Sequence, residues 1–278
     1  MTIKAIAMDM DGTLLNDEKQ ISKKTKAALL RAQAQGVKVI LASGRPTPGL
    51  SRDAEKLSLN ENNGLLLSFN GAHVLDATSK ETLFAQPLEI TDAQAILEHL
   101  KKFEVKPMIC RGDYMYVNDV YDNIVHLSEK NLNIIEYEAR ICGFKLCEVD
   151  DLAAFADFPI YKILTAGDPD YLAKYHQEMY APFKDHISAM FSDPFYFEFT
   201  NQGITKGNAL AHVLPQLGIK SSELIAFGDG QNDATMSEYA GIGVAMANAR
   251  DEVKAISDEV TLSNNEDGIA ATLEKYLF

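Results

Sequence analysis

Two aspartates separated by one residue follow an apolar run near the start of the sequence. Residues 3–8 read as a buried strand, and the chain continues into Asp9-Met10-Asp11, followed by Gly12. At an effective dielectric constant of about 20, two ionised carboxylates ~4 Å apart repel by roughly 4 kcal/mol. Such a pair needs a cation, a proton or a wide separation, and it therefore indicates a functional site.

Polar side chains also follow later apolar runs. Ser43 and Arg45 come after the run at 37–42, and Asn70 comes after the run at 65–69. Another apolar run, at 224–228, leads into a group that holds two further aspartates and an amide: Asp229, Asn232 and Asp233. Lys206 opens a stretch with helical periodicity. The carboxyl ends of parallel strands share one edge of a sheet, so we expect these side chains to converge.

The expected cluster consists largely of oxygen atoms. Carboxylate oxygens are the ligands that Mg²⁺ prefers, and Mg²⁺ would offset the repulsion among the four aspartates. Lys206, Ser43, Asn232 and the backbone amides after Asp9 could hold a phosphate. One carboxylate could then attack phosphorus, and a second, Asp11, could transfer protons.

The periodicity predicts an α/β fold interrupted by an insertion. A strand at 3–8, a helix at 22–35 capped by Ser22, and a strand at 37–42 form a βαβ unit, which requires a parallel sheet. The alternation returns after residue 203, where Thr205 is expected to cap a helix. We predict one domain formed by residues 1–84 and 203–278 and a second, inserted α/β domain at 85–202.

The inserted segment has a mixed pattern. Thr91 and Gln94 predict a capping box for a helix that runs to about residue 103, and residues 108–117 predict a hairpin. Further helices are expected at 122–131 and 169–180. Two strands around a turn at 192–194 complete the predicted domain.

Composition excludes several functional classes. The 278 residues carry a formal net charge of -14, which argues against nucleic-acid and anionic membrane partners. No apolar stretch is long enough to span a bilayer, and the start lacks the pattern of a signal peptide. The three cysteines, Cys110, Cys142 and Cys147, fit thiols in a reducing cytoplasm. We therefore expect a cytoplasmic protein.

The polar groups, in this order, resemble the four motifs of haloacid dehalogenase-like phosphatases. The Cof-type sugar-phosphatase branch (subfamily IIB), with an α/β cap between the second and third motifs, is the closest in pattern. The resemblance implies a Rossmann-like doubly wound parallel sheet with an inserted α/β cap. It is carried by Asp9-Met10-Asp11-Gly12-Thr13, Ser43-Gly44-Arg45-Pro46, Lys206-Gly207 and Gly228-Asp229-Gly230-Gln231-Asn232-Asp233.

The resemblance also implies a role for each motif residue. Asp9 would be the nucleophile and Asp11 the general acid and base. Mg²⁺ would be bound by Asp9, the Asp11 carbonyl and Asp229, with Asp233 in support. Phosphate or substrate would be contacted by Met10 in the loop after Asp9, Ser43, Lys206 and Asn232, with Arg45 and Asn70 reaching the substrate.

These implications lead to a Mg²⁺-dependent phosphatase that hydrolyses small phosphorylated metabolites, with sugar phosphates as the leading class, through an aspartyl phosphate. The cap is expected to close over the substrate and to set specificity. Two alternatives stay open, a phosphomutase that uses the same aspartyl phosphate and a non-catalytic regulator that binds a phosphometabolite. The sequence is compatible with a monomer or a homodimer.

Overall fold

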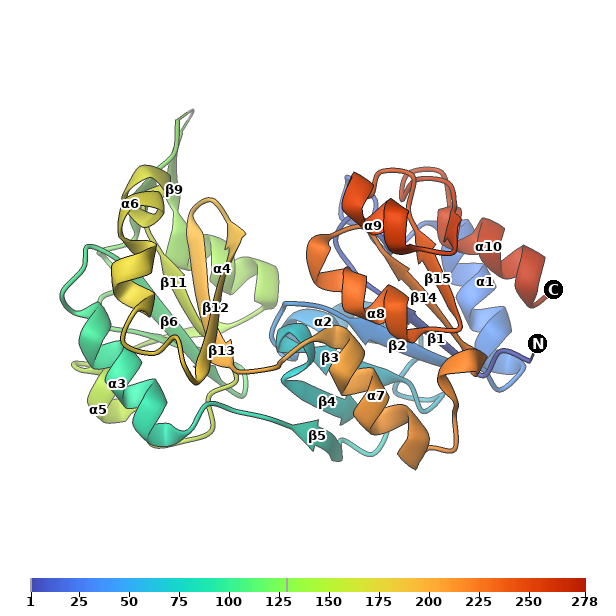
Figure 1. Cartoon of the computed structure of the whole chain (residues 1–278), viewed down its shortest axis with the longest axis horizontal. Helices are drawn as coiled ribbons and strands as arrows, with labels where there is room; N and C mark the ends of the chain where they lie inside the picture. The colour runs from blue at the N-terminus through green and yellow to red at the C-terminus, as the bar shows by residue number, and fades with distance from the viewer. Residues whose placement is uncertain (1, 129) are drawn as a thin grey trace. The chain divides into compact units, whose positions relative to one another are not determined.

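The computed structural model describes residues 2–128 and 130–278. The chain forms two compact units (Figure 1). One unit contains the chain up to Ala85 together with Thr205–Phe278, and the other is Gln86–Ile204. We refer to them as the core unit and the inserted unit. Within the described residues, no helix is long and apolar enough to cross a membrane.

The core unit is built on a largely parallel sheet in the order β16-β15-β14-β1-β2-β3-β4-β5. All pairs from β16 to β3 are parallel, whereas β3 with β4 and β4 with β5 are antiparallel. The strands are β1 (Ala5–Met8), β2 (Lys38–Ala42), β3 (Leu65–Ser68), β4 (His73–Asp76), β5 (Thr82–Ala85), β14 (Leu224–Gly228), β15 (Ile242–Ala245) and β16 (Glu259–Val260).

Helices cover both faces of this sheet (Figure 1). One buried cluster joins the sheet to α1, α2, α9 and α10, and another joins it to α7 and α8. Every residue of β1 is buried, as its continuous apolar sequence requires. The helices are α1 (Lys23–Ala34), α2 (Pro48–Lys56), α7 (Lys206–Gln216), α8 (Ala234–Tyr239), α9 (Asp251–Ile256) and α10 (Gly268–Tyr276).

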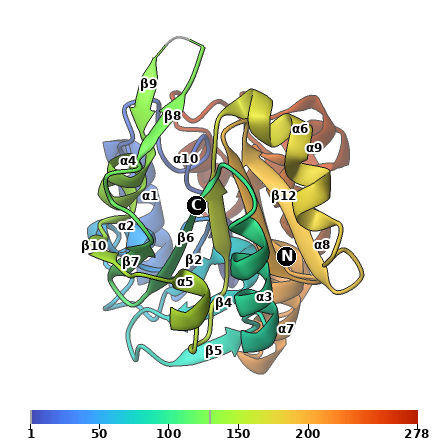
Figure 2. The same cartoon turned by 90° about the vertical axis from the view of Figure 1, so that its left-hand side faces the viewer.

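The inserted unit has its own sheet, in the order β10-β7-β6-β11-β13-β12, and a separate β8–β9 pair (Figure 2). One face of the larger sheet packs on α3, α5 and α6, and the other packs on α4. The elements are α3 (Ile90–Leu100), β6 (Lys106–Arg111), β7 (Tyr114–Val117), β8 (Ile124–His126), β9 (Asn131–Asn133), α4 (Ile134–Cys142), β10 (Lys145–Glu148), α5 (Leu152–Phe155), β11 (Ile163–Ala166), α6 (Pro169–Tyr180), β12 (Ile187–Asp193) and β13 (Tyr196–Asn201).

The fold class predicted from the sequence is confirmed, as are two predicted helix caps. The side chains of Ser22 and Thr205 accept hydrogen bonds from the backbone N–H groups of Thr25 and Asn208. The predicted capping box at Thr91 is wrong. α3 begins at Ile90, so Thr91 lies inside the first turn rather than at the N-cap.

The helix predicted at 122–131 is also wrong. This stretch contains β8 and the start of β9, which pair antiparallel. Val125 is fully buried whereas its two neighbours are exposed, so burial alternates with a period of two. β-branched residues at 124 and 125 favour that extended backbone, and the Asn123 side chain bonds back to the Val120 carbonyl at the turn before it.

Candidate active site

Three adjacent parallel strands place the central polar residues of the site. β1 lies between β14 and β2, and all three run in the same direction. Asp9 follows β1, Ser43 follows β2 and Asp229 follows β14. Their positions at the carboxyl edge of the sheet follow from the alternation of buried strands and covering helices.

A buried lysine joins two of the predicted aspartates. The Lys206 ammonium at the start of α7 lies 2.5 Å from Asp9 Oδ1 and 2.6 Å from Asp233 Oδ1. Lys206 and Asp233 are fully buried, and Asp9 is 8% exposed. The second carboxylate oxygen of Asp233 accepts hydrogen bonds from the backbone N–H groups of Asp229 and Gly230. Both carboxylate oxygens of Asp233 are therefore held by partners.

Asp229 is positioned by the loop that follows β1. The Thr13 hydroxyl donates a hydrogen bond of 2.7 Å to Asp229 Oδ1. Gly12 has a φ of +82°, and a Cβ atom at this position would lie 2.4 Å from Asp229 Oδ2. A larger residue would therefore push the loop away from the carboxylate, which explains the glycine and the threonine after the two aspartates.

The protonation of this cluster is governed by burial, which disfavours the charged form of a carboxyl group. Burial and the neighbouring charges of Asp233 and Asp229 raise the pKa of Asp9 to about 8, against the opposing effect of Lys206. Burial likewise raises the pKa of Asp229 to about 6. Burial opposes the charge on Lys206, but Asp233 and Asp9 outweigh it and raise the pKa of the ammonium.

The three aspartates form a group that fits a divalent metal ion. Asp9, Asp229 and Asp233 each offer a carboxylate oxygen, and these atoms all lie within 4.8 Å of one another. A single ammonium faces these acids, so the ionised cluster would carry excess negative charge. Oxygen ligands and a deficit of positive charge together suit a hard cation.

Asp11 lies outside this cluster and contacts two cations. Arg45 donates hydrogen bonds to both carboxylate oxygens of Asp11, at 2.9 Å and 2.7 Å. The Lys19 ammonium adds a third hydrogen bond at 2.8 Å. Burial acts to raise the pKa of Asp11, but the two cations outweigh it and hold the pKa below its usual range.

The remaining predicted residues form three smaller contacts. Ser43 is buried, and its hydroxyl accepts a hydrogen bond from the Arg45 backbone N–H at 3.1 Å. The Asn232 side chain donates to Asn70 Oδ1 at 3.0 Å. The side chain of Met10 is buried, and its carbonyl accepts from the Leu15 N–H.

Lys19 is the contact residue that sequence reasoning missed. It lies in a turn eight positions after Asp11, and no periodicity or motif marks it. The sequence marks Thr13 only as part of the first motif, and the structure gives its hydroxyl a specific partner, Asp229.

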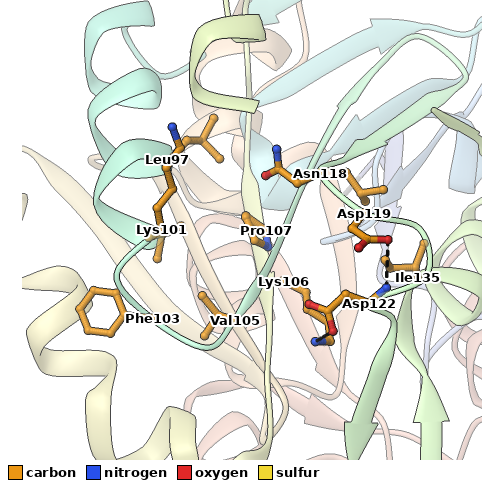
Figure 3. Close-up of a pocket in the computed structure, with 12 residues that line it drawn as sticks. Leu97, Lys101, Phe103, Val105, Lys106, Pro107, Asn118, Asp119, Asp122 and Ile135 are labelled. Carbon is orange, nitrogen blue, oxygen red and sulfur yellow. Dashed lines mark hydrogen bonds and ion pairs between the residues drawn. The ribbon is translucent and has the colours of Figure 1, made fainter. Parts of the chain in front are cut away.

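The inserted unit contains a separate cavity of about 240 Å³. Figure 3 shows Leu97 and Lys101 on one side of it and Asn118 and Asp119 on the other. None of the site residues predicted from the sequence belongs to the described lining of this cavity. The candidate active site is therefore defined by the core unit, where the titratable groups converge.

Comparison with known families agrees with this geometry. The model of the haloacid dehalogenase-like hydrolases matches residues 6–273, nearly the whole chain. A haloacid dehalogenase-like hydrolase from Bacteroides thetaiotaomicron has a similar crystal structure, with a TM-score of 0.90 and 33% identity over 99% of both chains. A sugar phosphatase of subclass IIB superposes with a TM-score of 0.78 at 24% identity over 98% of both chains, which is a likeness of fold alone.

Two curated relatives are phosphatases with different named substrates. A 5-amino-6-(5-phospho-D-ribitylamino)uracil phosphatase from Bacillus subtilis is 32% identical, over 99% of this chain and 96% of its own. A pyridoxal phosphate phosphatase from Escherichia coli is 27% identical, over 100% of both chains.

The chain belongs to the haloacid dehalogenase-like hydrolases. Within that family it is a phosphatase, as the order of its motifs predicts.

Proposed function

We propose that the protein is a Mg²⁺-dependent phosphomonoesterase that hydrolyses small phosphorylated metabolites through a phosphorylated Asp9. The observation that carries this proposal is the buried group of Asp9, Lys206, Asp233 and Asp229 at the carboxyl edge of the sheet. Three acids around one ammonium provide a metal site, and a carboxylate in the same group provides a nucleophile.

The residues fit the metal. Asp9 and Asp229 would bind Mg²⁺ through carboxylate oxygens, the Asp11 carbonyl would add a ligand, and Asp233 would support the site. A bound Mg²⁺ would favour the carboxylate form of Asp9 and offset the charge of the phosphate. Asp233 is already fixed by Lys206 and by two backbone N–H groups, so it can orient the metal site.

In the first half of the reaction, Asp9 attacks the phosphorus atom. A bond forms between a carboxylate oxygen of Asp9 and phosphorus, and the bond from phosphorus to the leaving oxygen breaks. Asp11 gives a proton to the leaving oxygen, and an alcohol departs. Lys206, the Ser43 hydroxyl and the Asn232 amide stabilise the negative charge on the transferring phosphoryl group.

In the second half, water attacks the phosphorylated Asp9. Asp11 takes a proton from the water, phosphate is released and the Asp9 carboxylate is restored. The contacts of Asp11 with Arg45 and Lys19 favour its carboxylate form, which is the form that this step needs. The proton that Asp11 takes from water here is the one that it gives to the leaving oxygen in the next turnover.

Sugar phosphates are the substrate class that the motifs favour. The named substrates of relatives, a phosphoribitylamino-uracil and pyridoxal phosphate, extend the candidates to other small phosphate monoesters. We place this activity in the cytoplasm, where such metabolites occur, and none of the described cysteines forms a disulfide.

A panel of phosphorylated metabolites, together with 4-nitrophenyl phosphate, tests the proposal through the release of inorganic phosphate. We expect release in Mg²⁺ and none in excess chelator, with recovery when Mg²⁺ is added back. Undiminished rates in chelator would refute the metal role. An isomerised hexose phosphate in place of free phosphate would identify a mutase instead.

A further inference from the structure

A hydrogen-bonded turn brings Lys19 to Asp11. Lys19 has a φ of +57°, and its backbone N–H donates to the Asn16 carbonyl at 2.8 Å. The Asn16 N–H donates to the Gln20 carbonyl, and the Gln20 N–H donates in turn to the Asn16 side chain at 2.8 Å. The turn thus has a defined conformation although the Lys19 side chain is 64% exposed.

A loop near the end of the chain anchors this turn. Asn265 donates to Asp17 Oδ2 at 2.9 Å and accepts from the Asp17 N–H at 3.1 Å. Asn264, which is buried, donates to the Leu15 carbonyl at 3.0 Å. The side chains of two consecutive asparagines, distant in sequence, therefore fix the backbone on which Lys19 stands.

Lys19 and Arg45 form a pair of cations around one carboxylate. Two N–H donors of Arg45 and one of Lys19 point at Asp11, and both cationic groups carry further donors. One acid between two cations leaves one positive charge in excess within this group, and the metal of the proposed function would neutralise the acids of the neighbouring cluster. In a protein whose formal net charge is -14, such a local excess marks a place that can attract an anion.

The proposed proton transfer by Asp11 indicates which part of the substrate lies near these two cations. Under the proposed function, on which this inference rests, Asp11 exchanges a proton with the leaving oxygen. Groups that contact the Asp11 carboxylate therefore lie on the leaving-group side of the phosphoryl site. Under the same proposal, Lys206, Ser43 and Asn232 contact the transferring phosphate itself.

We propose that Lys19, together with Arg45, recognises a second anionic group on the leaving group of the substrate. The preferred substrate is then a phosphate monoester that also carries a carboxylate or a second phosphate. A guanidinium binds either group through two parallel hydrogen bonds, and an ammonium adds a point charge. A monophosphate of an uncharged sugar lacks the second anionic group that these donors would bind.

Matched pairs of substrates test this proposal. 3-Phosphoglycerate carries a carboxylate where glycerol 3-phosphate carries a hydroxymethyl group. Fructose 1,6-bisphosphate carries a second phosphate that fructose 6-phosphate lacks. For wild type we expect a higher kcat/KM for the anionic member of at least one pair. For Lys19→Gln we expect the ratio within that pair to fall by about tenfold, because a hydrogen bond between charged groups is lost. Lys19→Arg should restore the ratio.

Lys23→Gln is the matched control, because Lys23 is an exposed lysine at the start of α1 and its loss changes the net charge equally. It should leave the ratio at the wild-type value. An equal loss for both members of a pair in Lys19→Gln would overturn the proposal, since Lys19 would then act through Asp11 alone. An unchanged ratio would also overturn it.

Binding to the Asp9→Asn variant separates this inference from the proposed function. Calorimetric titration with the same substrate pairs requires no turnover. Tighter binding of the anionic member, weakened by the added Lys19→Gln change, would support the second-anion site even if wild type released no phosphate. Equal affinity for both members of each pair would contradict it.

Discussion

Each unit of the protein buries a lysine against carboxylates, and the two arrangements differ in charge balance. In the inserted unit, Lys162 donates to Glu198 Oε1 at 2.9 Å, and both side chains are almost fully buried. Glu138 is nearby, but its oxygens accept hydrogen bonds from Tyr196 and Cys142. In the core unit, one lysine faces Asp9, Asp233 and Asp229.

The difference separates a structural ion pair from a chemical site. The ion pair of the inserted unit joins Lys162, just before β11, to Glu198 of β13, and Glu138 adds a second negative charge near the ammonium. Glu198 Oε2 is buried without a hydrogen-bond partner among the described residues. Buried carboxylates in excess of the nearby cations are costly to keep ionised. They need either a bound cation or a proton to neutralise their charge. The raised pKa of Asp9, about 8, is a sign of that excess.

Asp9→Asn should have the largest effect on activity. It removes the proposed nucleophile without changing the shape of the side chain, so we expect kcat to fall on the order of 10⁴-fold. Circular dichroism should show an intact fold. The comparable change in the other pair, Glu198→Gln, removes a buried charge without touching the proposed nucleophile. Turnover near the wild-type rate in Asp9→Asn would remove the nucleophile assignment.

Removing either buried lysine should lower stability, and the two variants should differ in their response to Mg²⁺. Without metal, Lys206→Met and Lys162→Met should each lower the free energy of unfolding by about 3–5 kcal/mol, because each leaves buried carboxylates without their cation. Urea unfolding measures this loss. Mg²⁺ should restore part of the stability of Lys206→Met and none of that of Lys162→Met. Equal responses of the two variants to Mg²⁺ would contradict the distinction.

Mg²⁺ should also stabilise the wild-type protein. At a concentration 100 times its Kd, a ligand that binds only the folded state adds about 2.7 kcal/mol to the free energy of unfolding. We expect Asp229→Asn to lose most of this gain and Glu198→Gln to retain it. Thermal unfolding at several Mg²⁺ concentrations provides the measurement, and a full gain in Asp229→Asn would exclude that residue as a ligand.

The smallest expected effect, taken per pH unit, is a slope in the pH dependence of stability. The pKa of Asp9 is raised from 3.8 to about 8 on folding, and that of Asp229 from 3.8 to about 6. The folded protein therefore holds these protons more tightly, and the stability they contribute is present below pH 3.8 and lost as the pH rises. Of these two groups, Asp9 is the one that keeps its proton in the folded state between pH 6 and 8. The free energy of unfolding should therefore fall by about 1.4 kcal/mol per pH unit in this range.

Metal-free urea unfolding between pH 6 and 8 checks this slope. Asp9→Asn should flatten it, and Glu198→Gln should leave it in place. A slope that persists in Asp9→Asn would assign the titration to another group.

The sequence predicts the parts of the site that depend on regular structure. Asp9, Ser43 and Asp229 could be placed together because each follows a buried strand of a parallel sheet, and Thr205 marked the helix that carries Lys206. Lys19 could not be found in this way. Its contact with Asp11 depends on a left-handed turn that is packed by residues about 245 positions later in the chain.

The inserted unit was less predictable for a related reason. Its short strands include the three-residue β8, whose burial pattern is too brief to separate a strand from a helix. The ion pair of Lys162 and Glu198 joins residues 36 positions apart, and neither has a local signal for it.

The position of β1 in the middle of the core sheet has a consequence for biosynthesis. One of its two neighbours, β14, is made more than two hundred residues later, as are Asp229 and Asp233, and Lys206 is made 197 residues after Asp9. A ribosome finishes the whole inserted unit before it makes any of them, and domains generally fold as they emerge. The segment that holds Asp9 must therefore wait for the last quarter of the chain, and only a polypeptide translated beyond Asp233 can assemble the acidic cluster.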